Sequence, residues 1–345
     1  MGEQPILLWC IAIPAMAGLV CYVVGRWAGR LTALIGLATA VVTFVLGCGL
    51  PGLRGSGYAL KWFEVGGFDV SMVLRVGALS GFAAAFVSLF GLVVVCFSVP
   101  YMWSHRYQGR YYAFTLWALA GSMGTMLADH LLFFLLSWEV VTLMLYLLVN
   151  LGREPAARVG AKTFVLLGFA DAALLLGIVF LWRLHDSKTF LMSEMGRLTL
   201  EQTGTTLGTA AFVLMFAGAI AKAGAFPLHT WIPAAAEAAP VPVMAFLPAS
   251  LDKLLGITLL ARLVLQLFAM TQALSIAVML IGAVTVLGAV MMAMVQHDLS
   301  LDCALRHGDI VRIPPATRRS MTSARRSPGM RSASISSSHA FSRAS

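Results

Sequence analysis

Nine long apolar stretches constrain the fold of this chain more than any other feature. Each is close to the 20 residues that a helix needs to cross a bilayer, and each holds at most two charged side chains. Only helices satisfy their own backbone hydrogen bonds in lipid, and the alternating pattern of barrel strands is missing. The sequence therefore predicts an all-α, polytopic membrane bundle of about nine transmembrane helices. The stretches are 6–25, 31–50, 76–101, 111–128, 131–150, 163–182, 204–226, 241–261 and 273–296.

Charge is scarce and unevenly placed along the chain. Only 11% of the 345 residues are charged and 59% are hydrophobic, whereas soluble domains carry about 25% charged residues. Eight Arg and two Asp in residues 299–345 supply a charge of +6, out of the net +9 of the whole chain. The apolar body is thus almost neutral, which excludes nucleic-acid binding by the body.

The composition of the chain changes at residue 299, and we divide the chain there. Residues 1–298 are predicted to form the transmembrane domain, and 299–345 are rich in Arg and Ser. The second segment has too little apolar surface to offset its ordering entropy, so we expect it to be disordered. The N-terminal residues before the first span contain no Lys or Arg, so this span is expected to remain as an anchor and not to be a cleaved signal peptide.

Basic residues in the short loops predict the orientation. Arg26 and Arg30 follow the first span, and Arg106 and Arg110 follow the third, whereas the loop after the fourth span has no Lys or Arg. Cytoplasmic loops carry the excess of basic residues. We therefore expect a multi-pass protein of the cell's inner (cytoplasmic) membrane with its N-terminus outside.

The sequence predicts that the chain binds neither a cofactor nor a metal. Its five cysteines stand alone, without the spacing of a zinc or iron–sulfur site. A membrane haem would need histidines inside the spans, and no span has one in its core.

Five charged residues lie within the predicted spans, where a charge is costly unless it is paired or hydrated and so suggests function. Glu139 lies near the middle of its span, and Lys222 stands just before Pro227, which breaks the helix. Broken helices at membrane depth usually line a cavity. An acid that can hold or release a lysine beside a hydrated break is what a proton path requires. The alternative is a static Glu139–Lys222 ion pair that joins two helices.

The other charged residues are assigned by position. His229 follows the break and is either a proton relay or a cap on the second half-helix. Asp252 and Lys253 are adjacent and point about 100° apart on a helix, so both cannot face one partner, and Lys253 is predicted to face the path. Asp252, and Asp171 in the sixth span, are predicted to tune the site or to bind a neighbouring helix.

Four segments resemble the antiporter-like, proton-translocating membrane subunits shared by complex I, energy-converting membrane-bound hydrogenases and Mrp-type Na+/H+ antiporters. The segments are LLFFLLSWEVVTLMLYLL, AKTFVLLGFADAALLLGI, AIAKAGAFPLHTWIPAAAEAAPVPVMAFLPASLDKLLGITLLAR and MMAMVQHDL. The resemblance covers roughly residues 75–299. The segment LPASLDKLLGI departs from the complex I members of this family, which usually carry a His before small residues at this place.

The resemblance implies roles for individual residues. Glu139 corresponds to the glutamate of the fifth span, and Lys222 to the lysine of the seventh span, on a helix broken at Pro227. Lys253 resembles a lysine of the eighth span found in some members, and His229 stands at a frequent His position. Asp171 resembles an acidic residue of the sixth span in the largest complex I member of this type.

The resemblance also implies about fourteen spans in two inverted repeats, of which this sequence shows the first and part of the second. One hypothesis is that the reading frame is lost at about Asp298 to Ser300, so that 300–345 are not family sequence. The rival is a genuine cytoplasmic basic tail. The other two frames of the downstream nucleotide sequence would decide between them.

The predicted function is proton translocation through a Glu/Lys half-channel, driven by redox chemistry in other membrane and peripheral subunits of the complex. The chain would have no catalytic chemistry of its own. A subunit of a multisubunit Na+/H+ antiporter and a non-functional truncated fragment are the alternatives.

Overall fold

A computed structural model describes residues 4–65, 68–152, 156–185 and 189–295 of the chain. Residues up to Met294 belong to one compact unit. The Arg/Ser-rich segment 299–345 and the proposed frame change at Asp298–Ser300 lie outside the described residues. The predictions made for them therefore stay predictions.

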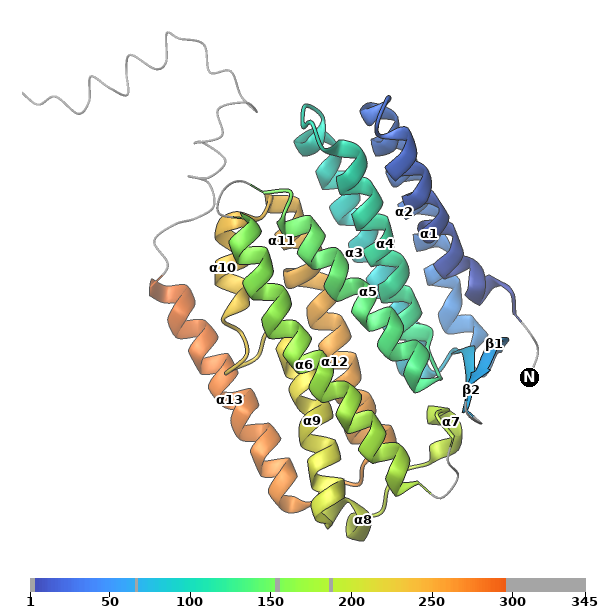
Figure 1. Ribbon diagram of the computed structural model, residues 1–345, viewed down its shortest axis with the longest axis vertical. Coiled ribbons are helices and arrows are strands. Elements are labelled where there is room, and N and C mark those ends of the chain that lie inside the picture. The colour runs from blue at the N-terminus through green and yellow to red at the C-terminus, as the bar shows by residue number, and fades with distance from the viewer. Residues whose placement is uncertain (1–3, 66–67, 153–155, 186–188, 296–345) are drawn as a thin grey trace, which may run out of the picture. The chain divides into compact units, whose positions relative to one another are not determined.

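The described chain is a bundle of long helices (Figure 1). Eight helical segments are long and apolar enough to cross a membrane, which confirms an all-α, multi-pass membrane fold. Seven of these segments are built on α1 (Ile6–Val24), α2 (Gly29–Gly49), α3 (Ala78–Met102), α5 (Leu131–Val149), α6 (Ala156–Leu184), α9 (Thr206–Ala223) and α13 (Gln272–Val295). The eighth runs over residues 241–267 and combines several shorter helices.

A ninth long helix, α4 (Gln108–Leu127), corresponds to the predicted span 111–128 but is not among those eight. It packs against α1, α2, α3 and α5. Apart from Arg110 and Trp117, all of its residues are buried. Because protein and not lipid surrounds α4, Ser, Thr and Gly can occupy positions that a lipid-facing helix fills with large apolar side chains.

Residues 51–75, which lie between the second and third predicted spans, largely form a β-hairpin. Strand β1 (Gly57–Val65) pairs antiparallel with β2 (Phe68–Arg75), in a register that places Gly57 opposite Arg75. Met72 and Leu74 of β2 are buried, and Leu74 forms a further bridge to Ala128. The alternation of apolar and polar residues in β2 is the period-2 signal of a half-buried strand. Between the sixth and seventh predicted spans lie the short helices α7 (Met192–Met195) and α8 (Leu200–Gly204).

Two parts of the bundle depart from regular α-helix. The chain breaks between α9 and α10 (Trp231–Ala238), around Pro227 as predicted. After α11 (Val241–Phe246) a π-helical turn covers Leu247–Leu251, and α12 (Asp252–Arg262) ends in a second π-helical turn, Leu263–Leu267. π-Turns within helices occur frequently at functional sites.

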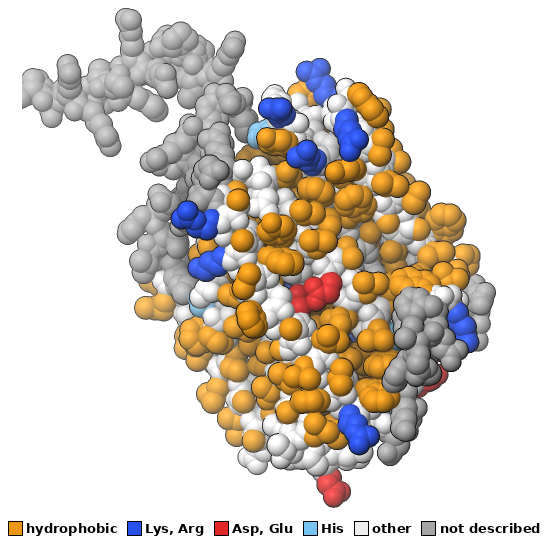
Figure 2. Space-filling model, in the orientation of Figure 1, with side chains coloured by type: hydrophobic (Ala, Val, Ile, Leu, Met, Phe, Trp, Pro, Cys, Tyr) orange, Lys and Arg blue, Asp and Glu red, His pale blue; other side chains and the backbone are white. Residues whose placement is uncertain are grey.

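The outer surface suits a bilayer. Apolar side chains cover most of the face in Figure 2, and several basic side chains gather toward one end. Among the apolar residues, Phe169 of α6 is 77% exposed. At the ends of helices, Arg26 lies 5.6 Å from the Tyr22 ring and Arg30 lies 5.7 Å from the Trp103 ring. Aromatic and basic residues of this kind anchor helices at the membrane interface.

Candidate functional site

Lys222 is the centre of the candidate site. It lies in the last turn of α9 and is only 1% exposed. Its Nζ donates hydrogen bonds of 2.8 Å to the backbone oxygen of Trp138 and 2.8 Å to Oγ1 of Thr142, both on α5. Nζ also lies 4.3 Å from the centroid of the Trp138 ring. A buried ammonium is thus held by neutral oxygen atoms and an aromatic face.

Close packing of α9 on α6 aims the lysine inward. A Cβ added at Gly218 would lie 2.9 Å from Cβ of Leu174 and 3.3 Å from the backbone oxygen of Ala170, both on α6. Residues four apart share one helix face, so Lys222 follows Gly218 on the face that packs against its neighbours. Small residues allow this approach without loss of packing.

Asp171 of α6 joins the same network. This buried carboxylate accepts a hydrogen bond of 2.6 Å from Nε1 of Trp138 and one of 3.0 Å from Oγ1 of Thr142. Thr142 therefore accepts from Lys222 and donates to Asp171. Both carboxylate oxygens of Asp171 and the amino group of Lys222 are therefore bonded to residues of α5. These polar contacts link α5, α6 and α9.

The helix break begins two residues after Lys222. Gly224 has φ +73°, and its N–H and that of Ala225 bond back to the carbonyls of Ala221 and Ile220, the pattern of a Schellman motif. A Cβ at Gly224 would collide with the side chain of Ile232, so only glycine fits there. The indole of Trp231 donates a further 3.0 Å bond to the Ala221 carbonyl. The carbonyls of Ile220 and Ala221, at the end of α9, thus find partners within the protein.

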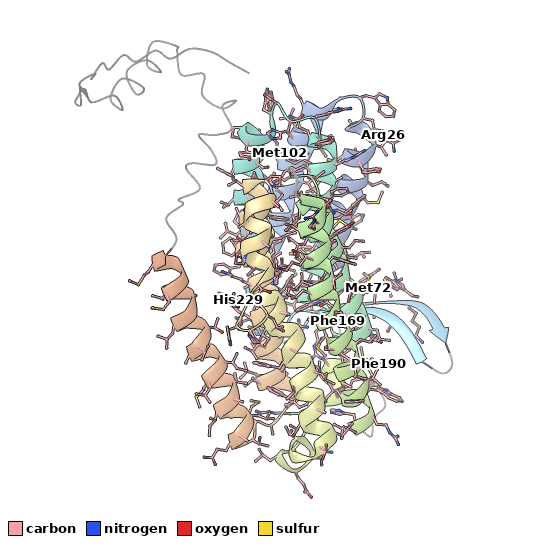
Figure 3. All side chains as sticks on the ribbon, turned by 60° about the vertical axis from the view of Figure 1, so that its left-hand side comes forward. Arg26, Met72, Met102, Phe169, Phe190 and His229 are labelled. Carbon is pink, nitrogen blue, oxygen red and sulfur yellow. The ribbon has the colours of Figure 1, made fainter. Side chains whose placement is uncertain are left out.

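Pro227 and His229 lie in the connection between α9 and α10. Pro227 is exposed and follows a cis peptide bond. His229 is half-buried, stacks on Phe226 with the ring centroids 5.7 Å apart, and lines a cavity of about 80 Å³ together with Thr285 of α13. In Figure 3 it lies beside α13, on the opposite side of the view from Phe190 and Met72. The structure therefore places His229 next to α13, and its Nδ1 has no hydrogen-bond partner among the described residues.

Glu139 lies near the middle of α5 and is half-buried. It interacts electrostatically with Asp171 and Lys222. The two hydrogen bonds of the Lys222 ammonium go to Trp138 and Thr142, not to Glu139. A carboxylate at membrane depth needs water or a partner.

Asp252 and Lys253, at the start of α12, point in different directions. Asp252 is 0% exposed, whereas Lys253 is exposed. Lys222 interacts electrostatically with Asp171, Asp252 and Glu139. The structure thus gathers three carboxyl groups around Lys222, and Lys253 faces away from them.

Sequence reasoning missed Trp138 and Thr142, which make the direct contacts to both Lys222 and Asp171. The signal was present, because the two residues are four apart in SWEVVT and so share a face of α5. Neither is ionisable, and a search restricted to charged residues passes over both.

A larger cavity, of about 440 Å³, lies at the other end of α12, near the hairpin. It is lined in part by Arg75, Asp129, Ser193 and Arg262. Arg262 is buried and donates to the backbone oxygens of Ala128 (2.9 Å) and Met126 (2.5 Å). This arginine therefore fixes the end of α12 to the α4–α5 corner.

Comparison with known proteins assigns the chain to a family. Residues 128–301 match the family described as "NADH:quinone oxidoreductase/Mrp antiporter, TM". This region holds the whole Lys222 site. The chain belongs to this family. Residues 62–112 also match the family of the N-terminus of chain 5 of NADH-ubiquinone oxidoreductase (complex I).

Curated members of the family are longer than this chain. The NAD(P)H-quinone oxidoreductase subunit 5 of Paulinella chromatophora is 29% identical over 274 residues, which are 78% of this chain and 41% of the relative. Chain 5 from a Picosynechococcus strain is also 29% identical, over 77% of this chain and 41% of the relative. The chloroplast subunit 5 of Zygnema circumcarinatum is 32% identical, over 70% and 35%.

Two solved structures share the fold of this family member. One is the membrane-bound sulfane sulfur reductase, an archaeal respiratory membrane complex, with a TM-score of 0.63 and 18% identity. The match covers 75% of this chain and 53% of the chain compared. The other is the Mrp complex from Dietzia sp. DQ12-45-1b, with a TM-score of 0.65 and 22% identity over 74% and 28% of the two chains.

Proposed function

We propose that this chain is a proton-translocating, antiporter-like subunit of a respiratory or hydrogenase-type membrane complex, driven by redox chemistry in partner subunits. The observation that carries the proposal is the setting of Lys222. It is a fully enclosed lysine beside a helix break, bonded to neutral oxygens and surrounded by Glu139, Asp171 and Asp252. Family membership and the names of the relatives support the same function.

Electrostatic coupling would move the proton. Two unit charges 8 Å apart interact by about 2 kcal/mol at an effective dielectric constant of about 20, and 1.4 kcal/mol is a factor of ten in an equilibrium. Adding or removing the charge of one carboxyl group at such a distance would therefore change the protonation equilibrium constant of Lys222 more than tenfold. Glu139, which is half-buried, would act as the gate, and Asp171 would tune the lysine through Thr142.

The remaining site residues would connect this centre to its surroundings. His229 would relay protons at the break between α9 and α10, and Lys253, on the exposed face of α12, would pass the proton beyond the described part. The complex would lie in the cell's inner membrane with the N-terminus of this chain outside. A subunit of a multisubunit Na+/H+ antiporter is the second candidate, because the family includes Mrp antiporters.

The test uses membrane vesicles that contain the assembled complex. Proton uptake and sodium uptake are measured for the wild type, Lys222→Met and Glu139→Gln, with Lys162→Met as a control because Lys162 is an exposed lysine of α6. We expect both site variants to lose proton uptake and the control to keep it. Undiminished proton uptake in Lys222→Met would overturn the proposal, and sodium uptake coupled to proton movement would favour the antiporter alternative. Failure of the wild-type chain to assemble would favour an inert fragment.

A further inference from the structure

Asp252 is an enclosed acid whose hydrogen-bonding capacity is unused. Its side chain is 0% exposed, and neither carboxyl oxygen has a hydrogen-bond partner among the described residues. A buried polar atom without a partner costs about 1–3 kcal/mol, and more when it is charged. Such an atom in a native structure calls for an explanation, such as a water molecule or a role in chemistry.

The position of Asp252 follows from close packing one turn later in α12. A Cβ at Gly256 would lie 2.5 Å from the Ala219 oxygen and 2.6 Å from the Ala223 nitrogen, so the backbones of α12 and α9 touch there. Asp252 precedes Gly256 by four residues and shares its face. Figure 1 shows α12 beside α9, and the two helices are in contact. Asp252 thus faces the end of α9 that carries Lys222.

The backbone before Asp252 is irregular, and Asp252 lies where a π-helical turn passes into α12. Its N–H bonds to the Leu247 carbonyl and closes the π-helical turn Leu247–Leu251. The Ser250 hydroxyl donates a 2.7 Å bond to the Ala245 carbonyl. These two bonds pair the Leu247 and Ala245 carbonyls with the Asp252 N–H and the Ser250 hydroxyl. The carboxyl group of Asp252 takes no part in them and faces the contact between α12 and α9.

Electrostatics connects Asp252 to the cluster around Lys222. The groups that act on it are Lys222 and Asp171. A hydrogen-bonded ion pair with Lys222 does not account for it, because Nζ bonds to Trp138 and Thr142 and neither Asp252 oxygen accepts a bond among the described residues. Lys253 is exposed on another face and does not occupy this position.

We infer that Asp252 is the group that accepts the proton leaving Lys222. The inference rests on the proposed proton-translocating function of the site. In the transfer step one bridging water molecule takes the proton released when an N–H bond of the Lys222 ammonium breaks, and gives one of its own protons to Asp252, where an O–H bond forms; no hydrogen bond joins the two groups directly within the described residues. An ammonium and a carboxylate become an amine and a carboxylic acid, so total charge and electrons are conserved. Lys253 would act only after Asp252.

The experiment combines proton uptake with infrared difference spectroscopy on the assembled complex. Asp252→Asn removes the acceptor at nearly constant volume, and Asp252→Glu keeps a carboxyl group. Asp129→Asn is the matched control, because Asp129 is a buried acid bonded to Ser193, at 2.5 Å and 3.1 Å, near the other end of α12. Removal of a positioned proton carrier typically costs about 100-fold or more in rate.

We expect Asp252→Asn to lower proton uptake roughly 100-fold, Asp252→Glu to restore part of it, and Asp129→Asn to retain it. A deuterium-sensitive carboxylic-acid band should appear during turnover in the wild type and in Lys253→Gln, and be missing in Asp252→Asn. If the Asn variant does not assemble, the Asp252→Glu variant replaces it in the test. A carboxylic-acid band shifted from that of the wild type supports the inference, and an unshifted band overturns it.

Two results separate the outcomes. Wild-type proton uptake in Asp252→Asn, or an acid band that persists in this variant, would overturn the inference about Asp252. The proposed function would still stand if Lys222→Met lost proton uptake. Undiminished uptake in Lys222→Met would instead overturn the proposed function, and this inference with it.

Discussion

Replacing Thr142 with Val tests the hydrogen bonds that join α5, α6 and α9. The Thr142 hydroxyl accepts a 2.8 Å bond from Lys222 and donates a 3.0 Å bond to Asp171. Val has nearly the same shape but leaves each of these buried groups without one partner. A hydrogen bond to a charged group contributes about 1.5–3 kcal/mol, and about 1.36 kcal/mol of barrier is a tenfold change in rate. We expect proton translocation to slow by roughly 10- to 150-fold.

The assay is the initial rate of proton uptake in vesicles, divided by the amount of assembled complex. Thr142→Ser keeps the hydroxyl and should stay close to the wild type. Thr125→Val is the matched control, because the buried Thr125 hydroxyl donates to the Gly121 carbonyl of its own helix, at 2.9 Å, and so joins no other helix through this bond. A wild-type rate in Thr142→Val, or an equal loss in Thr125→Val, would refute the bridging role of Thr142.

Two further predictions concern stability in detergent, measured as the free energy of unfolding. Gly256→Ala should destabilise the chain by about 1–3 kcal/mol, because the new Cβ meets the α9 backbone. Gly282→Ala is the control and should not destabilise the chain, because no described atom beyond its own helix backbone would lie within 4 Å of its Cβ. Equal effects of the two substitutions would contradict the close contact between α12 and α9. Arg262→Lys should cost about 1.5–3 kcal/mol, since lysine cannot form the fork that reaches two backbone carbonyls. An unchanged free energy of unfolding would show that Arg262 does not anchor α12.

The sequence was sufficient for the architecture where one physical rule dominated. Long apolar stretches have no alternative to helix in lipid, and Pro227 after Lys222 marked a break that the structure contains. The hairpin at 57–75 was not predicted, because the alternation of apolar and polar residues along its strands is short. α4 was predicted as a span, but the burial of nearly all its residues depends on which helices surround it.

The site was predictable only in part, because contacts between helices decide it. Charge in an apolar span identified Glu139, Asp171 and Lys222 as candidates. The choice between Asp252 and Lys253 depended on the rotation of α12, which close packing at Gly256 fixes. Neighbours one residue apart look alike in a hydropathy pattern, although one is fully buried and the other exposed.

The central claim is that Lys222 takes up and releases a proton during turnover. The most direct measurement is a nitrogen NMR spectrum of the complex labelled at lysine Nζ, with the Lys222 signal identified by its loss in Lys222→Met. We predict that this signal alternates between ammonium and neutral amine when the driving reaction is started and stopped. A signal that remains that of an ammonium throughout would contradict the account.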